Sequence, residues 1–161
     1  MCGICGYYST SVFGFKNSIH MMNDTLINRG PDDFGIWQDY ENGISLGHRR
    51  LSVLDLSNAG HQPMKSFTGR YMMVFNGEIY NHLSLRDEIE KSLGFKNWKG
   101  SSDTETLISM FDFWGIDLTL QKLNGMFAIA VWDKDEKTLT LVRDNFGEKP
   151  IYYGWQGNGR K

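Results

Sequence analysis

The sequence predicts an α+β fold in which stacked sheets are covered by helices. Residues 71–75 and 126–132 are apolar on both faces, which is typical of central strands. Two segments with helical periodicity separate them, and shorter strand-like segments come before and after. Strands that are buried on both faces need a layer on each side, so this order favours sheets that stack on each other beneath helices.

The first part of the chain is expected to form three strands and one helix. Residues 3–8 are apolar and aromatic, so a strand begins almost at the first residue. Residues 18–28 have the apolar spacing of one helix face, and a Gly-Pro pair follows soon after them. Strands are predicted at residues 36–38 and 44–51, on either side of a turn with the sequence Glu-Asn-Gly.

Two helices and the last strands are expected in the remainder. Residues 81–93 are amphipathic, with apolar side chains at every fourth position. Ser102-Asp103-Thr104-Glu105 can form a capping box, and the helix that it opens should end near Gly115. After the second central strand, further strands are predicted at residues 138–142 and at Tyr152-Tyr153.

Composition and charge exclude several classes of protein. The chain has 161 residues, which is the length of one domain. Its 17 basic and 19 acidic residues leave a net charge of −2, so it lacks the basic field of a nucleic-acid binder. No apolar run approaches the roughly 18 residues of a membrane span, and the N-terminus has no signal-peptide pattern. Two cysteines make no disulfide framework, so a cytoplasmic protein is expected.

Cys2 is the first candidate for chemistry. Removal of the initiator Met1, which is typical before a small residue, would leave Cys2 with both a thiol and a free α-amine. An α-amine has a pKa of about 7.7–8.0, so it can be partly neutral at neutral pH and accept the proton of the thiol. One residue would then hold nucleophile and base together. The alternative is an ordinary small, buried side chain.

Cys2-Gly3-Ile4-Cys5 also has the spacing of a C-x-x-C redox or zinc motif. A thioredoxin-type motif lies between a strand and a helix, whereas these residues belong to a predicted strand. Residues three apart on a strand point to opposite faces, which separates the two thiols. His48 and His61 have no partner at metal-ligand spacing, so we expect neither a redox pair nor a metal site.

Arg50 and Asn76-Gly77 lie at the ends of predicted strands. Arg50 shares a strand face with the apolar residues, where the core opens, and an arginine can bind a carboxylate through two hydrogen bonds. Arg49, on the other face, fits a surface arginine better. Asn-Gly between apolar runs predicts a hairpin turn, which the sequence alone favours. The same pair could direct a side-chain and a backbone N–H at one point, as an oxyanion hole does.

Two acids are candidates for binding a positively charged group. Asp103 stands at the start of a predicted helix, where the helix dipole alone favours an acid. It could also bind an ammonium group, and Glu78 is open to an equally ambiguous interpretation.

Short motifs over nearly the whole chain occur in the order that one enzyme family shows. In these motifs the chain resembles the N-terminal glutaminase domain of glutamine-hydrolysing asparagine synthetases, a class II glutamine amidotransferase and N-terminal-nucleophile hydrolase. Each motif alone is weak, but together they are highly specific. The motifs are Cys2-Gly3-Ile4, Arg29-Gly30-Pro31-Asp32, His48-Arg49-Arg50-Leu51-Ser52, Phe75-Asn76-Gly77-Glu78-Ile79-Tyr80-Asn81, Ser102-Asp103-Thr104-Glu105, Gly125-Met126-Phe127-Ala128, Arg143-Asp144 and Phe146-Gly147-Glu148-Lys149-Pro150.

The resemblance implies a fold and a reaction. The fold is a four-layer αββα sandwich of two stacked, mainly antiparallel sheets. The reaction is hydrolysis of L-glutamine to L-glutamate and ammonia. Cys2 would be the nucleophile, with its freed amine as the base, and Asn76 and Gly77 would form the oxyanion hole.

The resemblance also implies how glutamine is held. Arg50 would bind the α-carboxylate, with help from the main chain around Leu51 and Val53. Glu78 and Asp103 would contact the α-amino group. This domain would need no metal or other cofactor.

Two departures from the family indicate a piece of a longer protein. No Ser-Gly-Gly occurs, so the phosphate loop of the C-terminal ATP-pyrophosphatase domain, which uses ATP and magnesium, is absent. The chain also ends soon after Tyr152-Tyr153, short of the last strands expected of the sandwich. Residues 1–161 are therefore expected to be one glutaminase domain excised from a synthetase, with the C-terminal domain as its partner. A homodimer and a catalytically silent glutamine-binding module of the same fold stay open.

Overall fold

The computed structural model describes residues 1–9, 18–53 and 56–155. No helix in these ranges is both long enough and apolar enough to cross a membrane. The strands are β1 (Gly3–Tyr8), β2 (Asp33–Asp39), β3 (Ile44–Arg50), β4 (Met64–Lys65), β5 (Tyr71–Ile79), β6 (Gly125–Asp133) and β7 (Thr138–Arg143). The helices are α1 (Ser18–Asp24), α2 (His82–Leu93) and α3 (Asp103–Lys122), and η1 (Asn58–Gly60) is a single 3-10 turn.

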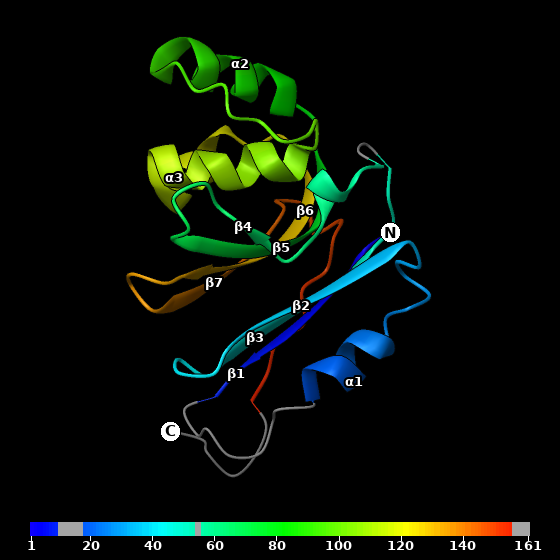
Figure 1. Ribbon diagram of the computed structural model, residues 1–161. Coiled ribbons are helices and arrows are strands. Elements are labelled where there is room, and N and C mark those ends of the chain that lie inside the picture. Colours follow the sequence, from blue (N-terminus) through cyan, green and yellow to red (C-terminus); the bar gives the residue numbers. More distant parts are fainter. Residues whose placement is uncertain (10–17, 54–55, 156–161) are drawn as a thin grey trace.

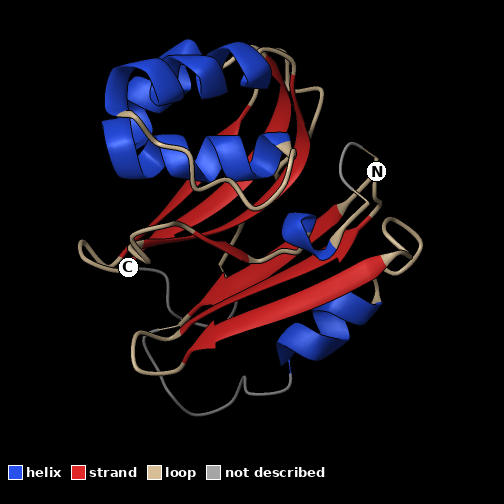
Figure 2. Ribbon diagram, turned by 45° about the horizontal axis from the view of Figure 1, so that its top comes forward, coloured by secondary structure: helices blue, strands red, loops and turns tan. Residues whose placement is uncertain are grey.

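The elements form four layers (Figure 1). The first sheet has the strand order β1-β3-β2 and the second has the order β4-β5-β6-β7, with antiparallel pairing throughout. Helix α1 packs on the first sheet, whereas α3 packs on the second and α2 packs on α3. Figure 2 shows these helices on the two outer sides, with the sheets between them. The predicted αββα sandwich is confirmed.

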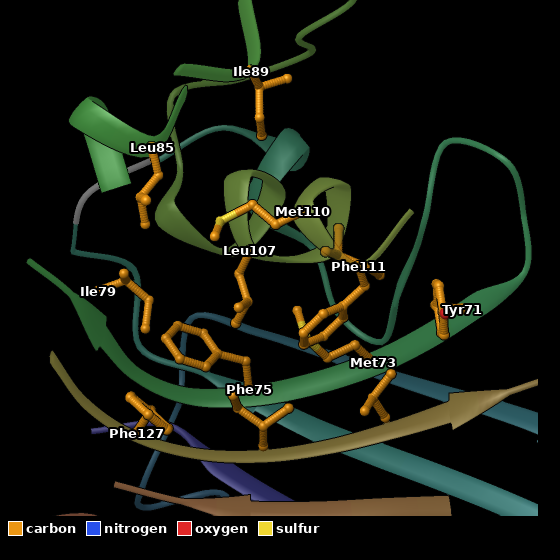
Figure 3. Packing of buried hydrophobic residues seen from close by; sticks show 13 residues of the cluster. Tyr71, Met73, Phe75, Ile79, Leu85, Ile89, Leu107, Met110, Phe111 and Phe127 are labelled. Atoms are coloured by element: carbon orange, nitrogen blue, oxygen red, sulfur yellow. The ribbon is translucent and has the colours of Figure 1, made fainter. Parts of the chain in front are cut away.

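The two faces of the second sheet contribute to two different apolar cores, and alternate residues of β5 belong to each. The odd-numbered residues face α2 and α3 and belong to the larger core, which Figure 3 shows. The even-numbered residues Met72 and Val74 face the first sheet, where they pack with Ile44 and Leu46 of β3. The larger core consists of Tyr71, Met73, Phe75, Ile79, Leu85, Ile89, Leu107, Ile108, Met110, Phe111, Phe127, Ile129 and Val131.

Several predicted elements are confirmed, although some begin or end at other residues than predicted. Strand β1 has the predicted bounds, and β2 is longer than the predicted 36–38 because all of its residues pair with β3. Helix α1 ends at Asp24 rather than at residue 28, because the chain then tightens into turns with i to i+3 hydrogen bonds, such as Ile27 N–H to Asp24 O at 3.3 Å.

Other predictions are wrong or incomplete. The hairpin predicted at Asn76-Gly77 is wrong, because β5 continues through both residues. Helix α3 does not end near Gly115; it kinks there, where φ is 75° and ψ is 171°, and then continues. Strand β4 has only two residues, which are too few to give a periodic signal, so the sequence does not predict it. Tyr152 and Tyr153 belong to no strand in the described part of the chain.

Candidate active site

One pocket is lined by every residue to which the family resemblance assigns a role. Both sheets and the first turn of α3 contribute to it, so the site is assembled from segments that are far apart in the sequence. Among the described residues, no group of three or more His, Cys, Asp or Glu side chains could hold a metal ion. The pocket is lined by Cys2, Arg50, Leu51, Val53, Asn76, Gly77, Glu78 and Asp103, together with Met1, Gly60, Gln62, Phe75, Ser102, Thr104, Met126 and Lys149.

Cys2 immediately precedes β1 and is held by the end of β3. Its Sγ lies 3.4 Å from the backbone N of Leu51 and 3.7 Å from the backbone O of Leu51. Its carbonyl oxygen accepts a hydrogen bond from Nε of Arg29 at 3.2 Å. Cys2 shares its strand parity with Ile4, which packs against the core between the sheets, so its thiol lies on the inner face of the first sheet.

Cys5 lies on the opposite face of β1. Its Sγ is 4.0 Å from Oδ1 of Asn23 in α1, and both cysteines are free thiols. Burial raises the pKa of Cys5 to about 11, although the charge of Arg49 opposes this shift. A buried thiol of this kind is a poor nucleophile at neutral pH. The C-x-x-C spacing therefore brings no redox pair together.

Arg50 and Arg49 point to opposite faces of β3, as their parity predicts. Arg50 lines the pocket and its Nη1 donates to the backbone O of Ser57 at 2.8 Å. A Cβ at Gly60 would lie only 2.0 Å from Nη2 of Arg50, so the guanidinium rests directly against this glycine. Arg49 instead donates through Nε to the backbone O of Asn23 at 3.1 Å, which attaches α1 to the sheet; because Arg49 is only 8% exposed, the expectation of a surface arginine is wrong.

The Arg-Gly-Pro-Asp motif supports the end of β3. The backbone N–H of Asp32 donates to the carbonyl oxygen of Arg50 at 3.0 Å. Oδ2 of Asp32 accepts the backbone N–H of Ser52 at 2.8 Å. These two contacts fix the main chain on both sides of Leu51, next to the Cys2 thiol.

Asn76 and Gly77 lie within β5, where pairing with β6 continues past both residues. Asn76 pairs with Ala128, and Gly77 pairs with Phe127. Asn76 is 7% exposed and continues the even-numbered series that faces the first sheet. Its side chain is therefore directed toward the sheet that carries Cys2 and Arg50.

The backbone N–H of Gly77 is directed away from β6. Alternate residues of an antiparallel strand point their N–H groups to the same edge. Phe75 and Ile79 identify this edge, because Oε1 of Gln62 accepts the N–H of Phe75 at 2.7 Å and Oδ2 of Asp103 accepts that of Ile79 at 2.9 Å. Gly77 lies between them, so its N–H is directed at the pocket between two edge groups that already have partners.

Asp103 begins α3 and faces the pocket beside Glu78. Its carboxylate accepts the backbone N–H of Ile79 and, at 2.8 Å, the backbone N–H of its neighbour Thr104. Burial raises the pKa of Asp103, although these hydrogen bonds oppose the shift. The predicted capping box is half formed: Ser102 Oγ accepts the N–H of Glu105 at 3.2 Å, whereas the Glu105 carboxylate accepts the N–H groups of residues 99 and 100.

The sequence assigns no role to Gln62 or Lys149, although both side chains are buried in the pocket. Gln62 lies in an irregular loop, where no pattern predicts that a glutamine is buried. Lys149 carries a signal only as part of a motif, and its Nζ lies 2.8 Å from Sδ of Met1. Asp144 fixes the Lys149 loop by accepting several backbone N–H groups, and although burial alone would raise its pKa, these bonds lower it to about 2.

The pocket thus combines the Arg50 guanidinium, the Lys149 ammonium, two carboxylates, a thiol and a strand N–H that faces inward. A guanidinium and a carboxylate in one pocket suit a ligand that carries both charges, such as a free amino acid. A thiol beside an Asn side chain and a backbone N–H suits attack on a carbonyl group, because these donors can stabilise the oxyanion.

Comparisons with known proteins identify the family of the chain. Residues 1–160 match the family described as "Glutamine amidotransferase domain". A putative glutamine-hydrolysing asparagine synthetase 2 of Methanocaldococcus jannaschii is 36% identical over 98% of this chain and 33% of its own length. Glutamine-hydrolysing asparagine synthetase 3 of Bacillus subtilis is 38% identical over 98% of this chain and 25% of its own length. The chain therefore spans about a quarter to a third of these relatives.

One solved structure has the same fold. Glutamine phosphoribosylpyrophosphate amidotransferase from B. subtilis, in complex with ADP and GMP, has a TM-score of 0.54 and 19% sequence identity. The match covers 87% of this chain and 36% of that protein. With a family match over nearly its whole length, this chain belongs to the glutamine amidotransferase domain family, in the group found in asparagine synthetase-like proteins.

Proposed function

We propose that this chain hydrolyses L-glutamine to L-glutamate and ammonia through a thioester at Cys2. The observation that carries the proposal is the convergence of Cys2, Arg50, Asn76, Gly77 and Asp103 on one pocket, although they come from four distant parts of the chain. Removal of Met1 is part of the proposal, because only then does Cys2 have a free α-amine.

In the proposed first half-reaction, the Cys2 thiol attacks the side-chain amide carbon of glutamine. The α-amine of Cys2 takes the thiol proton and then gives a proton to the departing nitrogen. A carbon–sulfur bond forms and the carbon–nitrogen bond breaks, which releases ammonia. Water then attacks the thioester with the amine as base, which releases glutamate and restores the thiol.

The oxyanion that forms in both half-reactions needs hydrogen-bond donors. In the proposal, the side-chain amide of Asn76 and the backbone N–H of Gly77 supply them. The inward direction of both groups on β5 supports this role. Such donors act mainly in the transition state, when the carbonyl oxygen becomes charged.

The charged end of glutamine would be held at the other side of the pocket. Arg50 would bind the α-carboxylate, assisted by the main chain around Leu51 and Val53. Asp103 and Glu78 would bind the α-ammonium group. The support for this orientation is the separation of charge, since the guanidinium belongs to the first sheet and both acids belong to the second sheet and its helix.

The ammonia would be used by another part of the parent protein. The relatives are glutamine-hydrolysing asparagine synthetases of which this chain covers a quarter to a third, so we propose a C-terminal synthetase domain as its partner. ATP and magnesium would serve that domain. The hydrolysis proposed here needs only the groups of this chain and water.

The proposal is tested by measuring glutamate release from glutamine by the wild type, Cys2→Ala and Cys5→Ala. Cys2→Ala should abolish release with an unchanged melting curve, because it removes only the nucleophile. Cys5→Ala is the matched control and should keep most of the activity, since Cys5 faces α1. A Cys2→Ala variant with wild-type activity would overturn the proposal, and equal losses in both variants would favour a redox pair. Glutamine binding without hydrolysis by the wild type would identify a silent module.

A further inference from the structure

One edge of β5 has a partner strand only as far as Met73, three residues before Asn76. Strand β4 has only two residues and pairs with Met72 and Met73. In the described part of the chain, no strand pairs with this edge of β5 beyond that point. The backbone groups of Phe75, which face this edge, therefore need other partners, because an unpaired buried N–H or C=O group is costly.

Two buried side chains take the place of the missing strand. Oε1 of Gln62 accepts the N–H of Phe75 at 2.7 Å, and Nε2 of His48 lies 3.1 Å from the carbonyl oxygen of Phe75. Gln62 is 3% exposed and His48 is 0% exposed. The two side chains come from different elements, so one residue of β5 is held by both β3 and the loop that precedes β4.

The contact between His48 and Phe75 has a defined direction. A carbonyl oxygen only accepts, so Nε2 of His48 must carry a proton and donate it. Burial lowers the pKa of His48 to about 4, although the bond to Phe75 opposes this shift, so the ring is neutral at physiological pH. Nδ1 is then unprotonated, and among the described residues it has no hydrogen-bond partner. The bond to Phe75 is thus the one hydrogen bond that the ring makes among the described residues.

The residue held in this way directly precedes the oxyanion donors of the proposed function. The carbonyl of Phe75 belongs to the peptide group that joins it to Asn76, and Gly77 is the next residue whose N–H faces the same edge. Two residues beyond Gly77, the N–H of Ile79 donates to the Asp103 carboxylate. Oxyanion donors are effective only within about 2.7–3.1 Å of the developing charge, so small shifts of this strand have a large effect.

We propose that His48 and Gln62 are positioning residues for the oxyanion hole. They fix the Phe75 peptide, and through it the direction of the Asn76 side chain and the Gly77 N–H. His48 also lies two residues before Arg50 on β3, so the same hydrogen bond fixes the substrate-binding end of β3 relative to the oxyanion strand. This inference rests on the proposed function, and it predicts an effect on kcat rather than on KM.

The test compares variants that remove each hydrogen bond with variants that keep it. His48→Met and Gln62→Met remove the donor and the acceptor at similar volume. His48→Gln keeps an N–H near the Nε2 position, and Gln62→Glu keeps an acceptor oxygen. Ile44→Ala is the matched control, since Ile44 is buried in the same layer of β3 but packs in the apolar core between the sheets.

We expect both Met variants to lower kcat for glutamine hydrolysis by about tenfold or more, with little change in KM. His48→Gln should restore most of the loss. Ile44→Ala should lower the melting temperature without a comparable loss of kcat. The rate of Cys2 alkylation by iodoacetamide should stay unchanged in all variants, because that displacement forms no oxyanion. A kcat loss in Ile44→Ala that matches the Met variants, or unchanged kcat in both Met variants, would overturn the inference.

Hydrogen exchange of the amides in residues 71–79 provides a readout that needs no activity. The Met variants should exchange faster at Phe75, Asn76 and Gly77 than the wild type, and Ile44→Ala should not show this local change. Unchanged exchange in the Met variants would overturn the inference even in an inactive protein. Loss of the proposed function alone would instead show as a wild type that releases no more glutamate than Cys2→Ala.

Discussion

The two sheets bring different parts of the pocket and are stabilised in different ways. The first sheet carries Cys2 and Arg50 and is covered by α1, which has seven residues. Its central strand β3 is buried along its whole length and is attached to its surroundings by polar contacts, such as Arg49 with α1 and Asp32 with Ser52. The second sheet carries Asn76, Gly77 and Glu78 and packs against the 20-residue α3 through the larger apolar core.

The difference shows how a pocket can separate its tasks. Under the proposed function, the groups that bind the α-carboxylate and attack the amide lie on the sheet held by polar contacts. The groups that stabilise charge in the transition state lie on the sheet with the larger apolar core. Substitutions in the two sheets should therefore have different kinetic signatures, which the following predictions use.

Apart from loss of the nucleophile, the largest effect is expected at Asn76, on the second sheet. Asn76→Ala should lower kcat by about 10²–10³ with little change in KM, because the donor acts mainly in the transition state. Asn76→Asp should be at least as inactive, since it places a negative charge where negative charge must develop. Steady-state kinetics and melting curves of both variants check this. An active and normally stable Asn76→Asp would rule out the oxyanion role.

A smaller effect with the opposite signature is expected at Arg50, on the first sheet. Arg50→Lys should raise KM for glutamine by about 10- to 100-fold with a smaller change in kcat, because lysine cannot grip a carboxylate with two parallel hydrogen bonds. Arg49→Lys should leave KM nearly unchanged but lower the melting temperature, since Arg49 attaches α1. The same kinetic measurements decide; a raised KM in Arg49→Lys alone would contradict the assignment of faces.

Asp103 should give the binding of glutamine a distinct pH dependence. Its raised pKa means that the carboxylate takes up a proton at a higher pH than an ordinary aspartic acid does. KM should therefore rise as the pH falls, by about tenfold once Asp103 is protonated, because the charge that holds the ammonium group is lost. Asp103→Asn should have a high KM at neutral pH and lack this acidic rise. If KM of Asp103→Asn rises at acidic pH as it does in the wild type, another group causes the rise.

The smallest effect is a loss of stability in mild acid. It comes from protonation of His48, which links β3 to β5 through its hydrogen bond to Phe75. The folded pKa of His48 is about 4 against an ordinary value of 6.5, so the unfolded chain binds the proton first as the pH falls. The contribution to stability is full above pH 6.5 and declines as the pH falls toward 4. At one pH unit below the unfolded pKa, the free energy of unfolding should be lower by about 1 kcal/mol. Denaturant titrations should show this loss in the wild type and not in His48→Gln, and equal losses would refute the cause.

The sequence predicted the arrangement of the strands better than their ends. Strand β1 and the central strands follow from their apolar patterns. The extended conformation of Asn76-Gly77 does not follow from the local sequence, because local turn preference favours a hairpin. Pairing with Ala128 and Phe127 of β6 keeps both residues extended. Gly115 interrupts helical geometry as expected, but packing of the following turn lets α3 continue to Lys122.

The candidate site was predictable where its residues occur in motifs. Cys2, Arg50 and Asp103 each gave a physical signal, and the order of the motifs connected them. Gln62 gave none, because its importance comes from the missing strand beside Phe75, which is a property of the sheet and not of the local sequence. From the sequence, His48 is only a histidine without a metal-ligand partner, because its actual partner is a carbonyl group 27 positions away.

The central claim is that Cys2, freed of Met1, attacks a glutamine side chain in the pocket between the sheets. Its most direct test is the intact mass and peptide map of the protein after reaction with a diazoketone analogue of glutamine, in which the reactive ketone replaces the amide. We expect a chain lighter by one methionine, with one analogue attached at Cys2 and protection by excess glutamine. Retention of Met1 in the reactive protein, or attachment at Cys5 in place of Cys2, would contradict it.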